Sequence, residues 1–175
     1  MKYMISLFLN MCLFRAKPED LPVSKNLLMH CIAAATVAFM IRNIMLTDSG
    51  GAVAYALIQG AMLGISLYLF LKVYKKTERW LQAASALYGC SAFMVAIALP
   101  ILAFAGPDVI FDSTLDLTKI LVVITSFWYF IITVFILKET LEIGKFAGFG
   151  MAILLEVMIG IAMAVMTGLM GTPVN

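Results

Sequence analysis

The chain has 175 residues, of which 63% are apolar and only 13% are charged, and its mean hydropathy is +1.04. Soluble domains are about 45–50% apolar and about 25% charged, so this composition excludes a soluble globular or disordered protein and indicates an integral membrane protein. A helix needs roughly 20 apolar residues to cross a bilayer, so the length allows about five to seven crossings, and we expect no soluble catalytic domain. The net charge of +2 is too small to predict binding to nucleic acid.

The N-terminal part of the chain, residues 1–25, begins with a short apolar stretch. This stretch is too short to cross a bilayer, and Lys2, Ser6 and Asn10 recur in it at a spacing of four residues. The spacing predicts a helix with one narrow polar stripe, which favours a position at the membrane interface or against a neighbouring helix. Because the stretch has no small-residue cleavage pattern, we expect it to be retained.

Five long apolar runs follow in the second part of the chain, residues 26–175. Pro18 and Pro22 separate them from the first stretch, and Ser24 is the predicted N-cap of the first run. Each run is long enough to cross a bilayer, and only a helix satisfies its own backbone hydrogen bonds in a single crossing. The sequence therefore predicts an all-α, five-helix transmembrane bundle preceded by an interfacial helix. The predicted spans are residues 26–46, 52–73, 80–105, 119–137 and 146–170.

The basic residues predict the orientation of the bundle. Only Arg42 and Lys119 fall on one side of the predicted membrane, and ten basic residues fall on the other side. The side rich in Lys and Arg is normally cytoplasmic, so we expect a cytoplasmic N-terminus and a C-terminus outside. The ten residues are Lys2, Arg15, Lys17, Lys25, Lys72, Lys75, Lys76, Arg79, Lys138 and Lys145.

Glu156 is the ionisable residue that lies deepest in a predicted span. It lies roughly 15 Å along the last helix, near the middle of the bilayer, where an unpaired charge costs a few kcal/mol or more. Glu156 could be structural, with a protonated or hydrogen-bonded carboxyl group that joins two helices. Alternatively, its carboxyl group could take up and release a proton or a cation. An ion pair with a partner subunit or with Arg42 is a third alternative. Gln59 would reach Glu156 if the second and fifth spans pack together.

Small residues recur every four positions on the second and the last span. Such ridges let two helices approach closely. Gly60 and Gly64 belong to the first ridge, and Gly148, Gly160 and Gly168 belong to the second. Both ridges predict helix packing, within the chain or between two copies of it.

Other polar and aromatic residues have simpler interpretations. Arg42 lies near the end of its span and is expected to extend to the lipid headgroups, whereas Trp128 lies in mid-span and is expected to pack inside the bundle. A basic run between the second and third spans predicts contact with anionic lipids, although the orientation signal alone would explain it. This run contains Lys72, Lys75, Lys76 and Arg79.

Motifs for catalysis, cofactors or metals are missing from the sequence. The cysteines, Cys12, Cys31 and Cys90, form no CxxC pair and lie in apolar stretches, which indicates buried and unreactive thiols. The sequence contains one histidine, His30, and a metal site needs several ligand side chains. We therefore expect no cofactor, no metal and no enzymatic activity.

Two long stretches resemble the Yip-domain superfamily of small membrane proteins. They are ERWLQAASALYGCSAFMVAIALPI, which contains Pro100, and SFWYFIITVFILKETLEIGKFAGFGMAILL, which contains Trp128. The resemblance covers roughly residues 26–170. It implies five helices, vesicle trafficking or membrane shaping through partners in eukaryotic members, and no catalytic residues. The long cytosolic N-terminal region and the DLYGP motif of the family are missing, so functions that depend on them are not implied.

Two functions follow as expectations. The first is a non-enzymatic, multi-pass protein of the bacterial inner membrane. The bacterial origin is inferred from the compact form of the chain and from the resemblance. It would act through helix packing and contact with lipids, a membrane-protein partner or a second copy. The alternative is a small oligomeric transporter or channel in which Glu156, with Gln59, forms a proton or cation site in the middle of the membrane.

Overall fold

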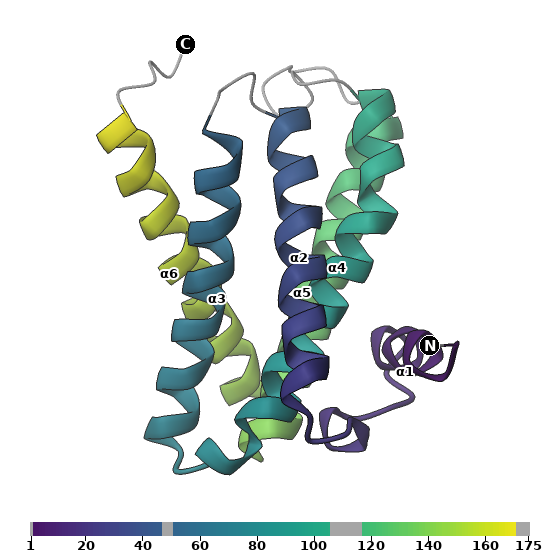
Figure 1. The fold of residues 1–175 in the computed structure, drawn as a ribbon, viewed down its shortest axis with the longest axis vertical. Coiled ribbons are helices and arrows are strands. Elements are labelled where there is room, and N and C mark those ends of the chain that lie inside the picture. The colour runs from purple at the N-terminus through teal and green to yellow at the C-terminus, as the bar shows by residue number, and fades with distance from the viewer. Residues whose placement is uncertain (1, 47–50, 106–116, 171–175) are drawn as a thin grey trace.

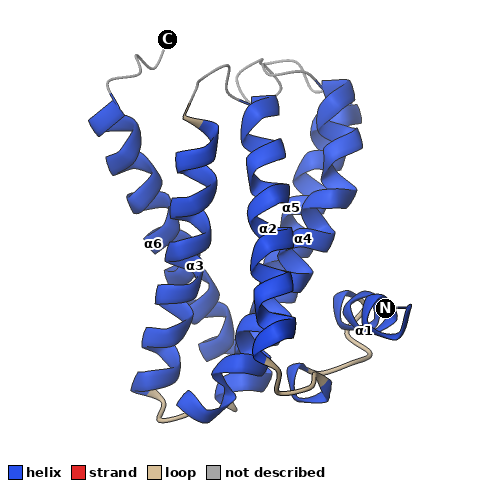
Figure 2. Ribbon diagram, viewed as in Figure 1, coloured by secondary structure: helices blue, strands red, loops and turns tan. Residues whose placement is uncertain are grey.

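The computed structural model describes residues 2–46, 51–105 and 117–170, and it describes side chains for residues 4–46, 51–104 and 117–168. The regular secondary structure of these residues is entirely helical, and short turns and loops connect the helices (Figure 2). The predicted connections at 47–50 and 106–116, and the side chain of Lys2, lie outside the described part. The helices are α1 (Lys2–Cys12), η1 (Pro18–Asp20), α2 (Lys25–Leu46), α3 (Ala52–Val73), η2 (Thr77–Arg79), α4 (Trp80–Ala105), α5 (Leu117–Leu141) and α6 (Lys145–Met170).

Helices α2 to α6 are each long and apolar enough to cross a membrane, so the chain is a multi-pass integral membrane protein. The predicted bounds agree with the structure for α3 and α4. Helix α5 is longer than predicted, because its helical hydrogen bonding continues past the apolar run to Leu141. Ser24 caps α2 as predicted: its Oγ accepts the Leu27 amide at 3.3 Å.

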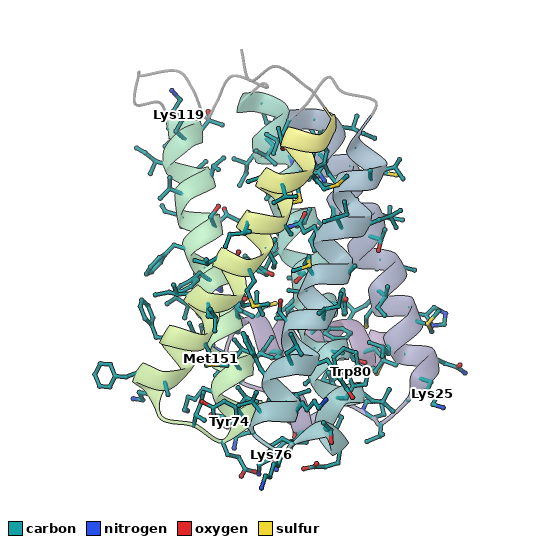
Figure 3. All side chains as sticks on the ribbon, turned by 90° about the vertical axis from the view of Figure 1, so that its left-hand side faces the viewer. Lys25, Tyr74, Lys76, Trp80, Lys119 and Met151 are labelled. Atoms are coloured by element: carbon teal, nitrogen blue, oxygen red, sulfur yellow. The ribbon has the colours of Figure 1, made fainter. Side chains whose placement is uncertain are left out.

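The five long helices form a closed ring. In order around the ring they are α2, α3, α6, α5 and α4, and α4 packs again on α2 (Figure 1). The end of the bundle at which α2, α4 and α6 begin is called the basic end. Figure 3 shows Lys25 and Lys76 at this end and Lys119 at the opposite end.

The half of the bundle next to the basic end is closely packed. Leu67, Ala83, Ile132 and Ile136 are fully buried there. Tyr88 of α4 joins α3, because its hydroxyl donates to the Gly60 carbonyl oxygen at 2.6 Å. A side chain at Gly64 would lie 2.6 Å from the same hydroxyl, so glycine is required for this approach.

Helix α1 lies beside the bundle and crosses the direction of the long helices (Figure 1). One face of α1 packs on α4, where Phe8 occupies the space that a side chain at Gly89 would need. Its other face leaves Ile5 and Leu9 exposed. Trp128 of α5 is 44% exposed and its Nε1 donates to the Cys12 carbonyl oxygen at 3.0 Å. The prediction that Trp128 packs inside the bundle is therefore wrong, because this tryptophan faces outward and holds the end of α1.

Three helices end in the same backbone turn without a glycine. Phe14, Lys75 and Glu142 follow α1, α3 and α5, and each has a φ between 56° and 60°. In each turn the next amide donates to a carbonyl oxygen five residues earlier, over 2.8–3.2 Å. These hydrogen bonds close the helix ends although none of the three positions carries the glycine that usually marks such a turn.

Candidate functional site

A cavity of about 350 Å³ lies inside the other half of the bundle, and all five long helices contribute to its wall. Its polar lining includes Arg42 of α2, Gln59 of α3, Tyr129 of α5 and Glu156 of α6. Helix α4 contributes apolar side chains such as Met94. Because α3 lies between α2 and α6 in the ring, Arg42 and Glu156 reach the cavity from helices that are not neighbours in the ring.

Arg42 turns into the bundle instead of extending to the headgroups. Its Nη2 donates to Gln59 Oε1 at 2.7 Å and to Asn43 Oδ1 at 3.3 Å, and its guanidinium carbon lies 5.7 Å from the centre of the Phe39 ring. The Nε atom is buried and has no hydrogen-bond partner among the described residues. The expected extension to the headgroups is thus wrong, since a side chain 17 positions along the chain captures the guanidinium.

Glu156 is half-buried and faces the same cavity. Within the described parts of the chain, its carboxylate takes part in no hydrogen bond and no direct ion pair. Arg42 lines the same cavity from another helix. Helices α3 and α6 do pack together, as the sequence prediction required, but Gln59 uses its amide oxygen for Arg42.

Three further polar residues of α5 belong to the cavity and were missed in the sequence. They are Thr125, Ser126 and Tyr129. The Tyr129 hydroxyl lies 3.1 Å from Ser91 Oγ, and the Thr125 hydroxyl donates to the Leu121 carbonyl oxygen at 2.7 Å. Thr125 and Tyr129 are four residues apart, so they lie on one face of the helix. This spacing is the feature of the sequence that could have predicted a polar face on α5.

The predicted packing glycines fall into two groups. Gly60, Gly64 and Gly148 are buried, and a side chain at Gly148 would lie 3.1 Å from the Lys138 side chain. Gly160 and Gly168 are exposed, with nothing among the described residues within 4 Å of an added side-chain carbon. The second ridge therefore packs inside the bundle only at its beginning, against α5.

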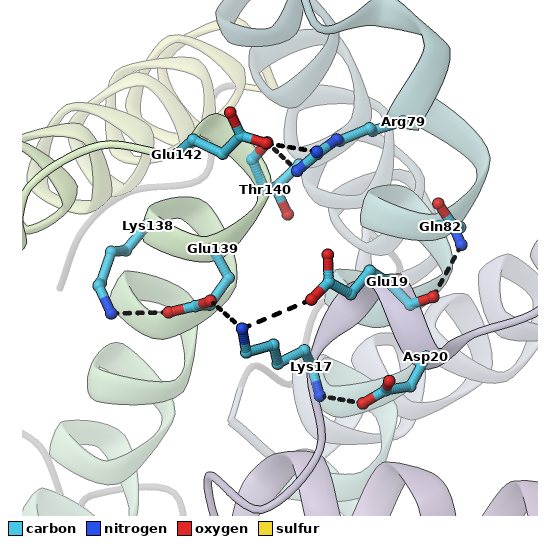
Figure 4. Close-up of polar contacts among 9 residues, drawn as sticks. All are labelled: Lys17, Glu19, Asp20, Arg79, Gln82, Lys138, Glu139, Thr140 and Glu142. Atoms are coloured by element: carbon cyan, nitrogen blue, oxygen red, sulfur yellow. Dashed lines mark hydrogen bonds and ion pairs between the residues drawn. The ribbon is translucent and has the colours of Figure 1, made fainter.

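The basic end contains a network of ion pairs. Lys76 and Arg79 both bind Glu142, and these contacts lower the pKa of that carboxyl group, with the hydrogen bond from Lys76 as the largest cause. Lys17 binds Glu139 at 3.3 Å and Glu19 at 3.5 Å, and Glu139 raises the pKa of Lys17 (Figure 4).

Two of the four predicted lipid-binding residues thus form ion pairs with a carboxylate of the protein itself. Lys76 and Arg79 bind Glu142, whereas Lys72 and Lys75 are exposed. Of these four residues, Lys72 and Lys75 are therefore the two that remain candidates for contact with anionic headgroups.

The described residues contain no group of three or more His, Cys, Asp or Glu side chains that would hold a metal ion. Cys12, Cys31 and Cys90 are free thiols and are buried. The polar cavity is therefore the chemically distinctive site in the described part of the bundle.

No protein-family model matches the chain, and comparison with curated proteins and with solved structures gives no match either. The resemblance to the Yip-domain superfamily stays a prediction.

Proposed function

We propose that the protein binds a small polar solute inside the membrane and acts as a non-enzymatic transporter or channel. One observation carries this proposal: five helices surround a single cavity that holds two opposite charges without a direct ion pair between them. The volume of about 350 Å³ lies within the roughly 300–1,000 Å³ that small-molecule sites occupy. Of the two functions expected from the sequence, the geometry therefore favours the alternative.

A purely structural role for Glu156 agrees less well with the geometry. A structural carboxyl group in a membrane would be hydrogen-bonded to a neighbouring helix, since an unpaired polar group costs free energy there. Glu156 has no such partner among the described residues and faces open volume. Its position favours contact with water, a proton or a solute.

We further propose a cytoplasmic N-terminus, an outer C-terminus and a location in the bacterial inner membrane. The basic end would then face the cytoplasm, with α1 at the cytoplasmic interface and its exposed Ile5 and Leu9 in the lipid. Reporter fusions after residue 76 and within residues 106–116 test this orientation. A cytoplasmic signal from 106–116 would contradict it.

The cavity itself can be tested by cysteine labelling in membrane vesicles. Thr125→Cys places a thiol on the cavity wall, and Val123→Cys places one on the lipid-facing side of the same helix, where the native side chain is 66% exposed. We expect a charged, water-soluble methanethiosulfonate reagent to modify the first thiol and not the second, over the low background of the three buried native cysteines. An unreactive Thr125→Cys from both sides of the membrane would indicate a closed structural void and contradict the proposal.

A second function, contact with anionic lipid, has its own support at the basic end. Lys72 and Lys75 are exposed there, and each basic residue near an anionic surface contributes about 1 kcal/mol. Replacing both with Gln should reduce the phosphatidylglycerol that co-purifies with the protein. Replacing Lys76, which binds Glu142, should have a smaller effect. Equal losses from both replacements would contradict a specific role for the two exposed lysines.

A further inference from the structure

Arg42 has hydrogen-bonding capacity that the protein leaves unused. Its Nη2 already donates to Gln59 and Asn43, but its Nε is buried and lacks a partner among the described residues. Gln59 and the ring of Phe39 hold the guanidinium in place. Its Nη1 group donates no hydrogen bond to the described residues, so it can bind an anionic group by a charge-assisted hydrogen bond. The α2 side of the cavity therefore fits an anionic group.

Glu156 offers the complementary charge on another side of the cavity. The other ionisable side chains on the cavity wall are Arg42 of α2 and Tyr129 of α5, and Glu156 forms no ion pair with Arg42. A carboxylate inside a membrane protein that has no partner in the protein is stabilised by a cationic group that donates hydrogen bonds. The α6 side of the cavity therefore fits an ammonium group.

The remaining wall is mostly apolar. Phe39, Leu63, Met94, Leu102 and Ile159 all line the cavity. Such a wall favours a solute whose uncharged part is a hydrocarbon or aromatic group, because its transfer from water is favourable.

From this arrangement we infer, on the basis of the proposed function, that the solute is a small zwitterion with an apolar body, such as an amino acid with an apolar side chain. Its carboxylate would bind Arg42, and its ammonium group would bind Glu156. Arg42 and Glu156 together carry no net charge, so a zwitterion satisfies both while the cavity stays neutral. A simple carboxylate would leave Glu156 without a partner, and a simple amine would leave Arg42 without one.

Matched solutes test the inference on the unaltered protein. Leucine is compared with 4-methylpentanoate, which lacks its ammonium group, and with 3-methylbutylamine, which lacks its carboxylate. Phenylalanine is compared in the same way with 3-phenylpropanoate and 2-phenylethylamine. We expect at least one of the two amino acids to bind the purified protein in lipid nanodiscs about tenfold or more tightly than both of its analogues, because a lost charged contact costs at least that factor.

Variants identify the residues that contact each end of the solute. Glu156→Gln, which keeps the side-chain shape, should abolish the preference for the amino acid over the matched carboxylate. Arg42→Gln should weaken amino-acid binding by about tenfold or more, and Arg42→Lys serves as a second variant if Arg42→Gln does not fold. Glu78→Gln, the same carboxylate-to-amide change at an exposed position outside the cavity, should change neither the preference nor the affinity.

Three results would overturn the inference. If the carboxylates bind as tightly as the amino acids, the site is an anion site and the proposed solute-binding function stands. If no amino acid binds while the Thr125→Cys thiol is labelled, the cavity takes another solute. If no amino acid binds and the thiol also stays unlabelled, both the inference and the proposed function are wrong.

Discussion

The same five helices build two different halves of the bundle. Near the basic end they pack without space, and Ala83, Leu87 and Ile136 are 0–1% exposed. In the other half they separate around a cavity of about 350 Å³. Along α5, for example, the fully buried Ile132 and Ile136 lie in the packed half next to the basic end. Thr125 and Tyr129 of the same helix line the cavity.

The charges differ between the two halves in the same way. At the basic end, Lys76 and Arg79 have a carboxylate partner at the rim of the bundle. In the cavity half, Arg42 and Glu156 lie inside the bundle without a direct ion pair between them. Charges that a fold needs for stability are normally paired or solvated, so the two cavity charges point to a solute.

The largest effect is expected in the packed half. Gly64→Ala would place a carbon 2.6 Å from the Tyr88 hydroxyl and disturb its hydrogen bond to Gly60. We expect a loss of about 2 kcal/mol in the free energy of unfolding, measured by thermal denaturation in detergent. Gly160→Ala is the matched control, because an added carbon there meets nothing within 4 Å among the described residues. Equal losses from both variants would contradict the packing assigned to Gly64.

Glu156→Gln and Glu142→Gln compare a carboxylate from each half. Glu156→Gln removes a poorly solvated charge, so the melting temperature should stay unchanged or rise, while solute binding or pH-driven flux in reconstituted vesicles falls about tenfold or more. Glu142→Gln should lower the melting temperature slightly, because Lys76 and Arg79 lose their partner. It should leave labelling of Thr125→Cys unchanged. Full flux in Glu156→Gln would contradict the functional role of Glu156.

The packed half follows more directly from sequence than the cavity half. Long apolar runs predicted five helices, and the bounds of α3 and α4 agree with the structure because proline, glycine and charged residues lie at their ends. The small residues of α3 predict a close approach of neighbouring groups. In the structure an added side-chain carbon at Gly64 would meet the Tyr88 hydroxyl, whereas one at Gly60 would meet Thr36 at an ordinary contact distance of 3.8 Å.

The cavity half depends on contacts between positions far apart in the chain. Arg42 near the end of a helix predicts extension to the headgroups, and only its hydrogen bond to Gln59 reverses that expectation. Trp128 likewise lies in mid-helix, but the Cys12 carbonyl 116 positions earlier draws it to the outside. The order of helices around the ring decides both outcomes, and hydropathy alone does not encode that order.

Trp128 links the end of α1 to α5. Trp128→Phe removes the hydrogen bond to the Cys12 carbonyl and keeps most of the aromatic contact. Because the bond is partly exposed, we expect a loss of about 0.5–1 kcal/mol in the docking of α1. Faster amide hydrogen exchange in residues 4–12, without faster exchange in α3, would confirm the effect. Uniformly faster exchange would contradict a local role for this tryptophan.

The smallest effect is the pH dependence of the ion pairs at the basic end. Lys76 and Arg79 lower the pKa of Glu142 in the folded chain, so the folded protein binds this proton less readily than the unfolded chain. The contribution is therefore complete above pH about 4.5 and disappears as the pH falls through the lowered pKa. The difference in melting temperature between the unaltered protein and Glu142→Gln should shrink as the pH falls from about 6 to about 3. A constant difference across this range would show that Glu142 stabilises the basic end by shape instead of charge.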